Sequence, residues 1–86
     1  MFKVFAEERV KKDIRNINKD DLKRIFNNIK ALELNPLPLG VKKIKKGPES
    51  YYRIRQGDFR IGYRFDTVQK LIEIIYIRRR SERTYK

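Results

Sequence analysis

The segment Tyr51–Asp66, YYRIRQGDFRIGYRFD, contains two runs of alternating apolar and polar residues, separated by Gly57-Asp58. A period of two predicts half-buried β-strands, and a Gly-Asp pair between them predicts a two-residue hairpin loop. Counting outward from that loop pairs Arg55 with Arg60, and paired residues lie on the same side of a sheet. The other expected pairs are Gln56 with Phe59, Ile54 with Ile61, Arg53 with Gly62, Tyr52 with Tyr63 and Tyr51 with Arg64.

One side of the predicted hairpin is therefore apolar and the other is rich in arginine. The apolar side holds Tyr52, Ile54, Phe59, Ile61, Tyr63 and Phe65, and the opposite side holds Tyr51, Arg53, Arg55, Arg60, Gly62 and Arg64. Like charges directly across strands destabilise a sheet, so this pattern carries a cost. Because the guanidinium fork binds phosphate oxygens in pairs, the pattern favours a phosphate-binding face over a merely solvated one.

The rest of the chain supplies helices before the hairpin and strands around it. Phe2, Val4 and Ala6 predict a short opening strand, and apolar residues at helical spacing then predict a helix through Ile17 and a second one after Asn18. VKKIKKG (41–47) is typical of an edge strand, and Leu71–Ile77 of a further strand. We expect an α+β fold of one domain, residues 1–86. It would be βαα followed by an antiparallel β-meander, with both helices on one face of a small sheet.

Composition limits the possible functions. The chain of 86 residues contains no Cys and no His, which excludes disulfides, thiolate metal sites and imidazole ligands. We therefore expect no metal and no small-molecule cofactor. No run of about 20 apolar residues is present, so we expect no membrane span and a cytoplasmic protein.

The net charge of +12 is concentrated in the second half of the chain. Residues 1–40 carry 9 basic and 6 acidic side chains, whereas residues 41–86 carry 14 and 5. Such asymmetry indicates a polyanionic partner, most often a nucleic acid. We assign RNA contacts to basic and aromatic side chains of the arginine-rich side, the lysine-rich strand and the C-terminal tail. They are Tyr51, Arg64, Lys43, Lys45, Lys46, Arg78, Arg80 and Arg83.

The order of elements, the segment YRIRQGDFRIGY (52–63) and the ending IYIRRRSERTYK (75–86) resemble the RelE/ParE superfamily of toxin–antitoxin toxins. The resemblance covers essentially the whole chain. It implies a RelE-like fold and a metal-independent endoribonuclease that cuts mRNA in the ribosomal A site and so inhibits translation. In that reaction the 2′-hydroxyl attacks the adjacent phosphate. The resemblance also implies a cognate antitoxin, the ribosome and mRNA as partners.

The family's catalytic positions correspond here to Arg53 and Arg55 on the first hairpin strand, Arg60 on the second, and Arg79 and Tyr85 in the tail. The resemblance implies that Arg53 and Arg60 bind the phosphate, that Arg79 stabilises the leaving oxygen, and that Tyr85 stacks on a nucleobase.

Arg55 departs from the family pattern. RelE toxins often carry a lysine there as a candidate general base, and arginine is too strongly basic for that role. The proton acceptor is then Tyr85 or Glu73, or catalysis rests on transition-state stabilisation alone. Two alternatives remain: a ParE-like toxin that inhibits DNA gyrase, and a non-catalytic module that binds RNA or the ribosome.

Overall fold

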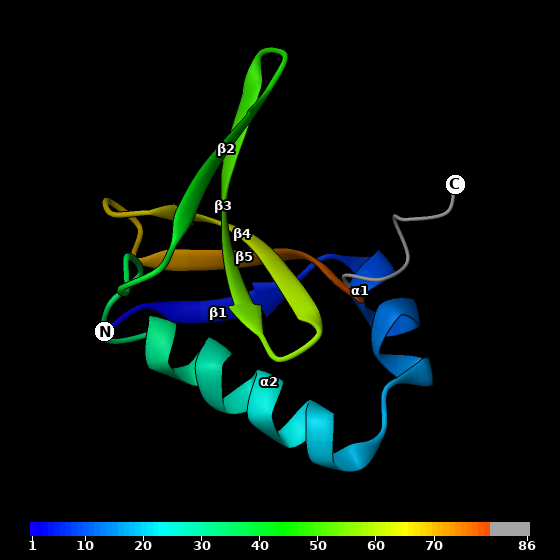
Figure 1. Cartoon of the computed structure of the whole chain (residues 1–86). Coiled ribbons are helices and arrows are strands. Elements are labelled where there is room, and N and C mark those ends of the chain that lie inside the picture. The colour runs from blue at the N-terminus through cyan, green and yellow to red at the C-terminus, as the bar shows by residue number, and fades with distance from the viewer. Residues whose placement is uncertain (80–86) are drawn as a thin grey trace.

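The computed structural model describes residues 1–79, which form helices packed on a five-stranded sheet (Figure 1). The elements follow in the order β1 (Lys3–Ala6), α1 (Glu8–Asp13), the 3₁₀ turn η1 (Ile14–Asn16), α2 (Lys19–Leu32), β2 (Lys42–Lys46), β3 (Glu49–Gln56), β4 (Phe59–Asp66) and β5 (Leu71–Arg79). The strand order is β1-β5-β4-β3-β2, with β1 parallel to β5 and all other neighbours antiparallel. The predicted α+β class and its meander are confirmed.

The hairpin register matches the prediction closely. The β3–β4 ladder contains five of the six expected pairs, from Gln56 with Phe59 to Tyr52 with Tyr63, and it ends there. Gly57 has φ of 58°, as the first position of a primed two-residue turn requires. Because this turn and the alternation are both local features, the sequence was sufficient to set the register.

Helix α2 begins where local chemistry predicts. The Asn18 side chain accepts a hydrogen bond from the Asp21 backbone N–H at 2.9 Å, which confirms the expected N-cap. The first expected helix is shorter than its apolar spacing indicated, because α1 gives way to a 3₁₀ turn before Ile17. Ile17 is nevertheless buried, so its apolar side chain was correctly assigned to the core.

The core lies between the helices and one face of the sheet. It contains Ile54, Phe59, Ile61, Tyr63, Ile72, Ile74 and Ile77 from the strands and Val10, Ile25, Ile29 and Leu32 from the helices. The opposite face of the sheet is left uncovered by helix α2 (Figure 1). The expected arginine-rich side of the β3–β4 hairpin is part of that opposite face.

Candidate nucleic-acid interface

The face of the sheet opposite the core is basic across four strands, and we call it the arginine face. Residues paired across the ladders share a side, so the face can be read from the register. On these strands it comprises Lys42, Ile44 and Lys46 of β2, Glu49, Tyr51, Arg53 and Arg55 of β3, Arg60, Gly62, Arg64 and Asp66 of β4, and Leu71, Glu73, Tyr76 and Arg78 of β5.

Three arginines lie side by side across this face. Arg55 pairs with Arg60, and Arg60 pairs in turn with Arg78. Since neighbouring strands lie about 4.8 Å apart, the three backbones span only about 10 Å. We call these residues the arginine row. Arg53 and Lys42 stand opposite each other in the next row, and the described residues offer the buried Nε of Arg53 no hydrogen-bond partner.

A bulge in β5 decides which tail arginine joins the row. The β4–β5 register shifts between Gly62 and Tyr63, so that Ile75 has no partner in the ladder. The shift reverses the sides taken by later residues, as an inserted residue does. Arg78 therefore faces the arginine row. Arg79 lies on the opposite side with its guanidinium carbon 4.8 Å from the ring centre of Phe59, so the structure does not bring it together with Arg60.

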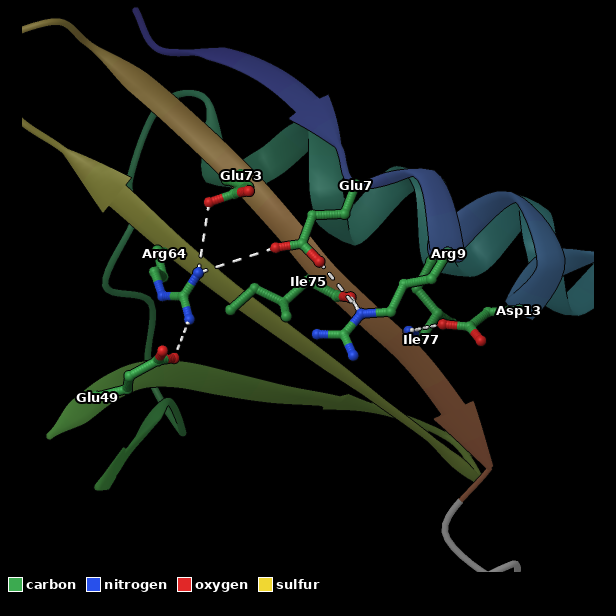
Figure 2. Close-up of polar contacts among 8 residues, drawn as sticks. All are labelled: Glu7, Arg9, Asp13, Glu49, Arg64, Glu73, Ile75 and Ile77. Carbon is green, nitrogen blue, oxygen red and sulfur yellow. Dashed lines mark hydrogen bonds and ion pairs between the residues drawn. The ribbon is translucent and has the colours of Figure 1, made fainter. Parts of the chain in front are cut away.

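Helix α1 binds the free edge of β5 where strand β1 ends. The last β1 pair is Ala6 with Ile74. Beyond it, Arg9 Nε donates a hydrogen bond to the Ile75 carbonyl at 2.9 Å, and the Ile77 N–H donates to Asp13 at 3.1 Å (Figure 2). These side chains satisfy backbone groups that no strand reaches, so α1 holds the bulged part of β5 in place.

Tyr76 lies across the middle of the arginine face. A Cβ built on Gly62 would stand 2.3 Å from the Tyr76 ring, so only glycine allows the ring to lie so close to β4. The Tyr51 ring meets Tyr76 edge to face at 5.7 Å, and the Arg78 guanidinium carbon lies 4.9 Å from the Tyr76 ring centre. Burial, together with the hydrogen bond to Tyr51, raises the pKa of Tyr76 to about 12, so its phenol stays protonated at neutral pH.

Arg64 is surrounded by carboxylates rather than open to a phosphate. It contacts Glu49 at 2.6 Å, Glu73 at 3.5 Å and Glu7 at 3.9 Å (Figure 2). Burial raises the pKa of Glu73, and a hydrogen bond and the charge of Glu7 act in the same direction, whereas Arg64 opposes them. Arg64 therefore links three strands and the start of α1. Three carboxylates offset its charge, so Arg64 is a weaker candidate for an RNA contact than the arginines of the row.

The lysines of β2 divide between the two sides. Lys43 pairs with Tyr52 on the core side, and its amine lies 6.0 Å from the Tyr52 ring centre. Lys45 shares the side of Lys43 by alternation, whereas Lys46 lies on the arginine face. Lys42, which the sequence analysis did not single out, lies on the arginine face opposite Arg53. Arg80, Arg83 and Tyr85 lie outside the described residues.

Sequence reasoning also missed Tyr76 and Arg9. The adjacent isoleucines Ile74 and Ile75 break the alternation of β5, and this break is the signal that could have placed Tyr76 on the arginine face. Arg9 gave no such signal, because its contacts lie 66 residues away in sequence. Within residues 1–79, no cluster of three potential metal ligands occurs and no helix is long and apolar enough to cross a membrane.

Comparison with known proteins identifies the family. The family described as "ParE toxin of type II toxin-antitoxin system, parDE" matches residues 4–84. A Methanocaldococcus jannaschii protein whose name assigns it as toxin RelE1 is 37% identical over 87 residues, covering 99% of this chain and 96% of the relative.

Solved structures agree with that result. RelE in the RelE–RelB complex from Pyrococcus horikoshii OT3 aligns with a TM-score of 0.79 at 26% identity, covering 92% of this chain and 94% of that one. The RelB–RelE complex from Methanococcus jannaschii gives a TM-score of 0.70 at 30% identity, with 91% and 92% covered. The chain therefore belongs to the RelE/ParE superfamily of toxins from type II toxin–antitoxin systems.

Proposed function

We propose that this toxin is a metal-independent endoribonuclease that cleaves mRNA in the ribosomal A site and thereby inhibits translation. The observation that carries the proposal is the arginine row, Arg55, Arg60 and Arg78, with Arg53 beside it. Preorganised guanidinium groups on one rigid sheet can bind a phosphate and offset charge that develops on it.

The proposed reaction is an in-line displacement at phosphorus. The 2′-oxygen forms a bond to the adjacent phosphorus as the bond from phosphorus to the 5′-oxygen breaks, which leaves a 2′,3′-cyclic phosphate and a free 5′-hydroxyl. Arg53 and Arg60 bind the nonbridging oxygens. Arg78 stands beside Arg60 and is better placed than Arg79 to stabilise the leaving oxygen. Stacking of Tyr85 on a nucleobase stays a prediction.

A general base is not evident among the described residues of the row. Arg55 stays protonated at any physiological pH. Glu73 is engaged by Arg64, which is four residues and about 13 Å along β4 from Arg60. Tyr76 holds its proton because its pKa is about 12. Of the proton acceptors that the sequence indicates, Tyr85 stays a prediction, and from residues 1–79 we propose transition-state stabilisation by arginine, for which one well-aimed donor is worth about 2.7–4 kcal/mol of barrier.

The cognate antitoxin is the second proposed partner. The RelE proteins from Pyrococcus horikoshii and Methanococcus jannaschii were solved in complexes with RelB. A protein of net charge +12 is poorly suited to exist free among the nucleic acids of the cytoplasm. We infer that an acidic antitoxin covers the arginine face or displaces the tail. Failure of the purified toxin to bind the product of its neighbouring gene would refute this inference.

A cleavage map tests the proposed activity. Purified toxin is added to ribosomes programmed with a defined mRNA, and the cuts are located by primer extension. We expect cuts confined to the A-site codon and a loss of about 10²–10³-fold in rate for Arg60→Ala. Arg24→Ala is the matched control, since it removes the same side chain from exposed α2 and should retain full cleavage.

A second candidate, gyrase inhibition, is favoured by the match of residues 4–84 to the ParE toxin family. It predicts intact mRNA in the ribosome assay and inhibition of DNA supercoiling by gyrase. The third candidate, a non-catalytic RNA- or ribosome-binding module, predicts intact mRNA and unaffected gyrase together with co-sedimentation of the toxin with ribosomes. Together the two assays and the sedimentation distinguish all three.

A further inference from the structure

A pocket of about 410 Å³ opens on the arginine face beside the arginine row. It is lined by the β2–β3 hairpin tip (Lys46, Pro48 and Glu49), by Tyr51 and Arg64, by Ile75, Tyr76 and Arg78 of β5, and by Arg9 of α1. The hairpin arm extends beyond the rest of the sheet in Figure 1, and its tip supplies one wall. The volume falls in the range of about 300–1,000 Å³ that small-molecule sites occupy.

Two cations in this lining are available to an anionic ligand. Arg64 is offset by three carboxylates, and Arg9 contacts Glu7 at 3.2 Å. No carboxylate of the described chain lies within ion-pair distance of Lys46 or Arg78. Lys46 stands at the hairpin tip and Arg78 belongs to the arginine row, so free positive charge flanks the pocket at both sides.

Aromatic rings supply the remaining surface. Tyr51 and Tyr76 are half-buried, and their edge-to-face contact at 5.7 Å fixes the two rings at 84° to each other. Gly62 admits the Tyr76 ring, and α1 holds the backbone of β5 beneath it through Arg9. The rings are therefore preorganised, and aromatic side chains beside a positively charged groove form a typical stacking site for single-stranded nucleic acid.

We propose that this pocket binds one unpaired nucleobase of the RNA chain, stacked on Tyr51 and Arg78, while the phosphate linked to it lies on the arginine row. The proposal rests on the proposed RNA-cleaving function and adds a base-binding subsite to it. Tyr51 and Arg78 contact the base. Tyr76 and Gly62 are positioning residues, because they act through the Tyr51 and Arg78 side chains that pack on the Tyr76 ring.

The test uses short single-stranded RNAs that carry 2-aminopurine at successive positions, mixed with the purified full-length toxin. Stacking quenches 2-aminopurine fluorescence, and anisotropy of an end label reports affinity separately. We expect quenching at one position near the cleavage site. Tyr51→Leu should lose it and weaken binding by about 5- to 150-fold, the equivalent of one stacked base. Tyr51→Phe should keep the quenching, since it keeps the ring.

Two further variants distinguish the placement of the pocket rings from the mere presence of aromatic residues in the protein. Gly62→Ala leaves the identity of every pocket side chain unchanged but displaces the Tyr76 ring, so quenching should fall. Phe26→Leu is the matched control, because it removes a half-exposed aromatic ring from α2 on the other layer and should change neither readout. Circular dichroism and thermal unfolding establish that each variant is folded.

Clear outcomes overturn the proposal. Quenching that is absent at every position for wild type excludes the base pocket, even where the same protein cleaves mRNA on ribosomes, and directs attention to an acidic peptide as the occupant. Unchanged quenching and affinity in Tyr51→Leu exclude it as well. The proposed function fails by a different result, namely intact mRNA with wild-type toxin, so the two failures are distinguishable.

Discussion

Gly62 shows how a single missing side chain shapes the interface. Its neighbour across the β4–β5 ladder is Tyr76, whose ring occupies the space that any Cβ would take. Glycine inside a strand normally weakens it by about 0.5–1 kcal/mol relative to alanine. At this position the loss is offset by the packing of an aromatic ring against the exposed backbone.

The effect of Gly62→Ala on the free energy of unfolding should therefore depend on whether the Tyr76 ring is present. In wild type we expect a loss of about 1–3 kcal/mol in the free energy of unfolding, because the Tyr76 ring must move. In a Tyr76→Ala background the same substitution should be neutral or stabilising, since the clash is gone. Urea unfolding of the four proteins of this double-mutant cycle measures the coupling. Additive effects would show that the ring does not depend on the glycine.

Because Tyr63 is buried, we expect the free energy of unfolding to fall at alkaline pH. Tyr63 is fully buried, its hydroxyl donates to the Pro36 carbonyl at 2.5 Å, and burial raises its pKa to about 12. The folded state keeps this proton where the unfolded chain, with a pKa of about 10, releases it. The stabilising contribution is therefore complete below pH 10, and it is lost as the pH rises from 10 to 12, at up to about 1.4 kcal/mol per unit.

The matched variant is Tyr63→Phe. At pH 8 it should be less stable by about 0.5–1.5 kcal/mol, the value of one hydrogen bond. Because phenylalanine does not titrate, its curve of unfolding free energy against pH should approach the wild-type curve between pH 10 and 11. Urea titrations at pH 8, 9, 10 and 11 provide the comparison, and parallel curves would contradict the assignment.

At the scale of elements, the bulge in β5 decides the composition of the arginine row. Strict alternation from Leu71 would place Arg79 on the same side as Glu73. The extra residue Ile75 instead turns Tyr76 and Arg78 to that side. Arg79 then packs on Phe59 and lines a second cavity of about 260 Å³, whose lining also includes Lys12, Asn16 and Arg78.

Paired variants of the two arginines test the consequence of the bulge. Arg78→Ala should slow mRNA cleavage by about 10²-fold with little change in stability, since it removes a cation of the arginine row. Arg79→Ala should retain most of the cleavage and lower stability by about 0.5–1 kcal/mol through the lost contact with Phe59. Ribosome cleavage assays and urea unfolding measure both effects. The reverse pattern would assign the leaving-group role to Arg79, as the family resemblance implies.

At the scale of the whole molecule, the sheet separates the arginine face from the helices. Helices cover one face of the sheet (Figure 1), and the strand register places Arg53, Arg55, Arg60 and Arg78 on the other. A single polyanion can therefore contact several cations without meeting the acidic residues of α2, which are Asp20 and Asp21.

Affinity for single-stranded RNA should consequently depend on salt. Four cations, Arg53, Arg55, Arg60 and Arg78, correspond to a slope of about −3 in a plot of log association constant against log salt concentration. Arg60→Ala should make that slope shallower by about 0.7, whereas Arg24→Ala on α2 should leave it unchanged. Anisotropy titrations at salt concentrations from about 50 to about 300 mM measure this slope. Equal slopes for both variants would contradict binding at the arginine face.

The sequence alone determined the α+β class, the N-cap at Asn18, the β3–β4 register and the segregation of Arg53, Arg55 and Arg60 from the core. These features follow from a two-residue turn, a cap and the alternation of side chains, all of which act over a few residues. The pairing of β4 with β5 was less accessible, because a bulge changes the side of every residue that follows it.

Only the tertiary structure decided three further features. It placed Arg78 rather than Arg79 in the arginine row, surrounded Arg64 with Glu7, Glu49 and Glu73, and joined Tyr51 to Tyr76 beside the hairpin tip. Each depends on contacts between residues far apart in the chain, and such contacts form only when the strands pair into the sheet and α1 packs on β5. Local pattern thus selected the residue types of the interface, and the register between distant strands selected which of them meet.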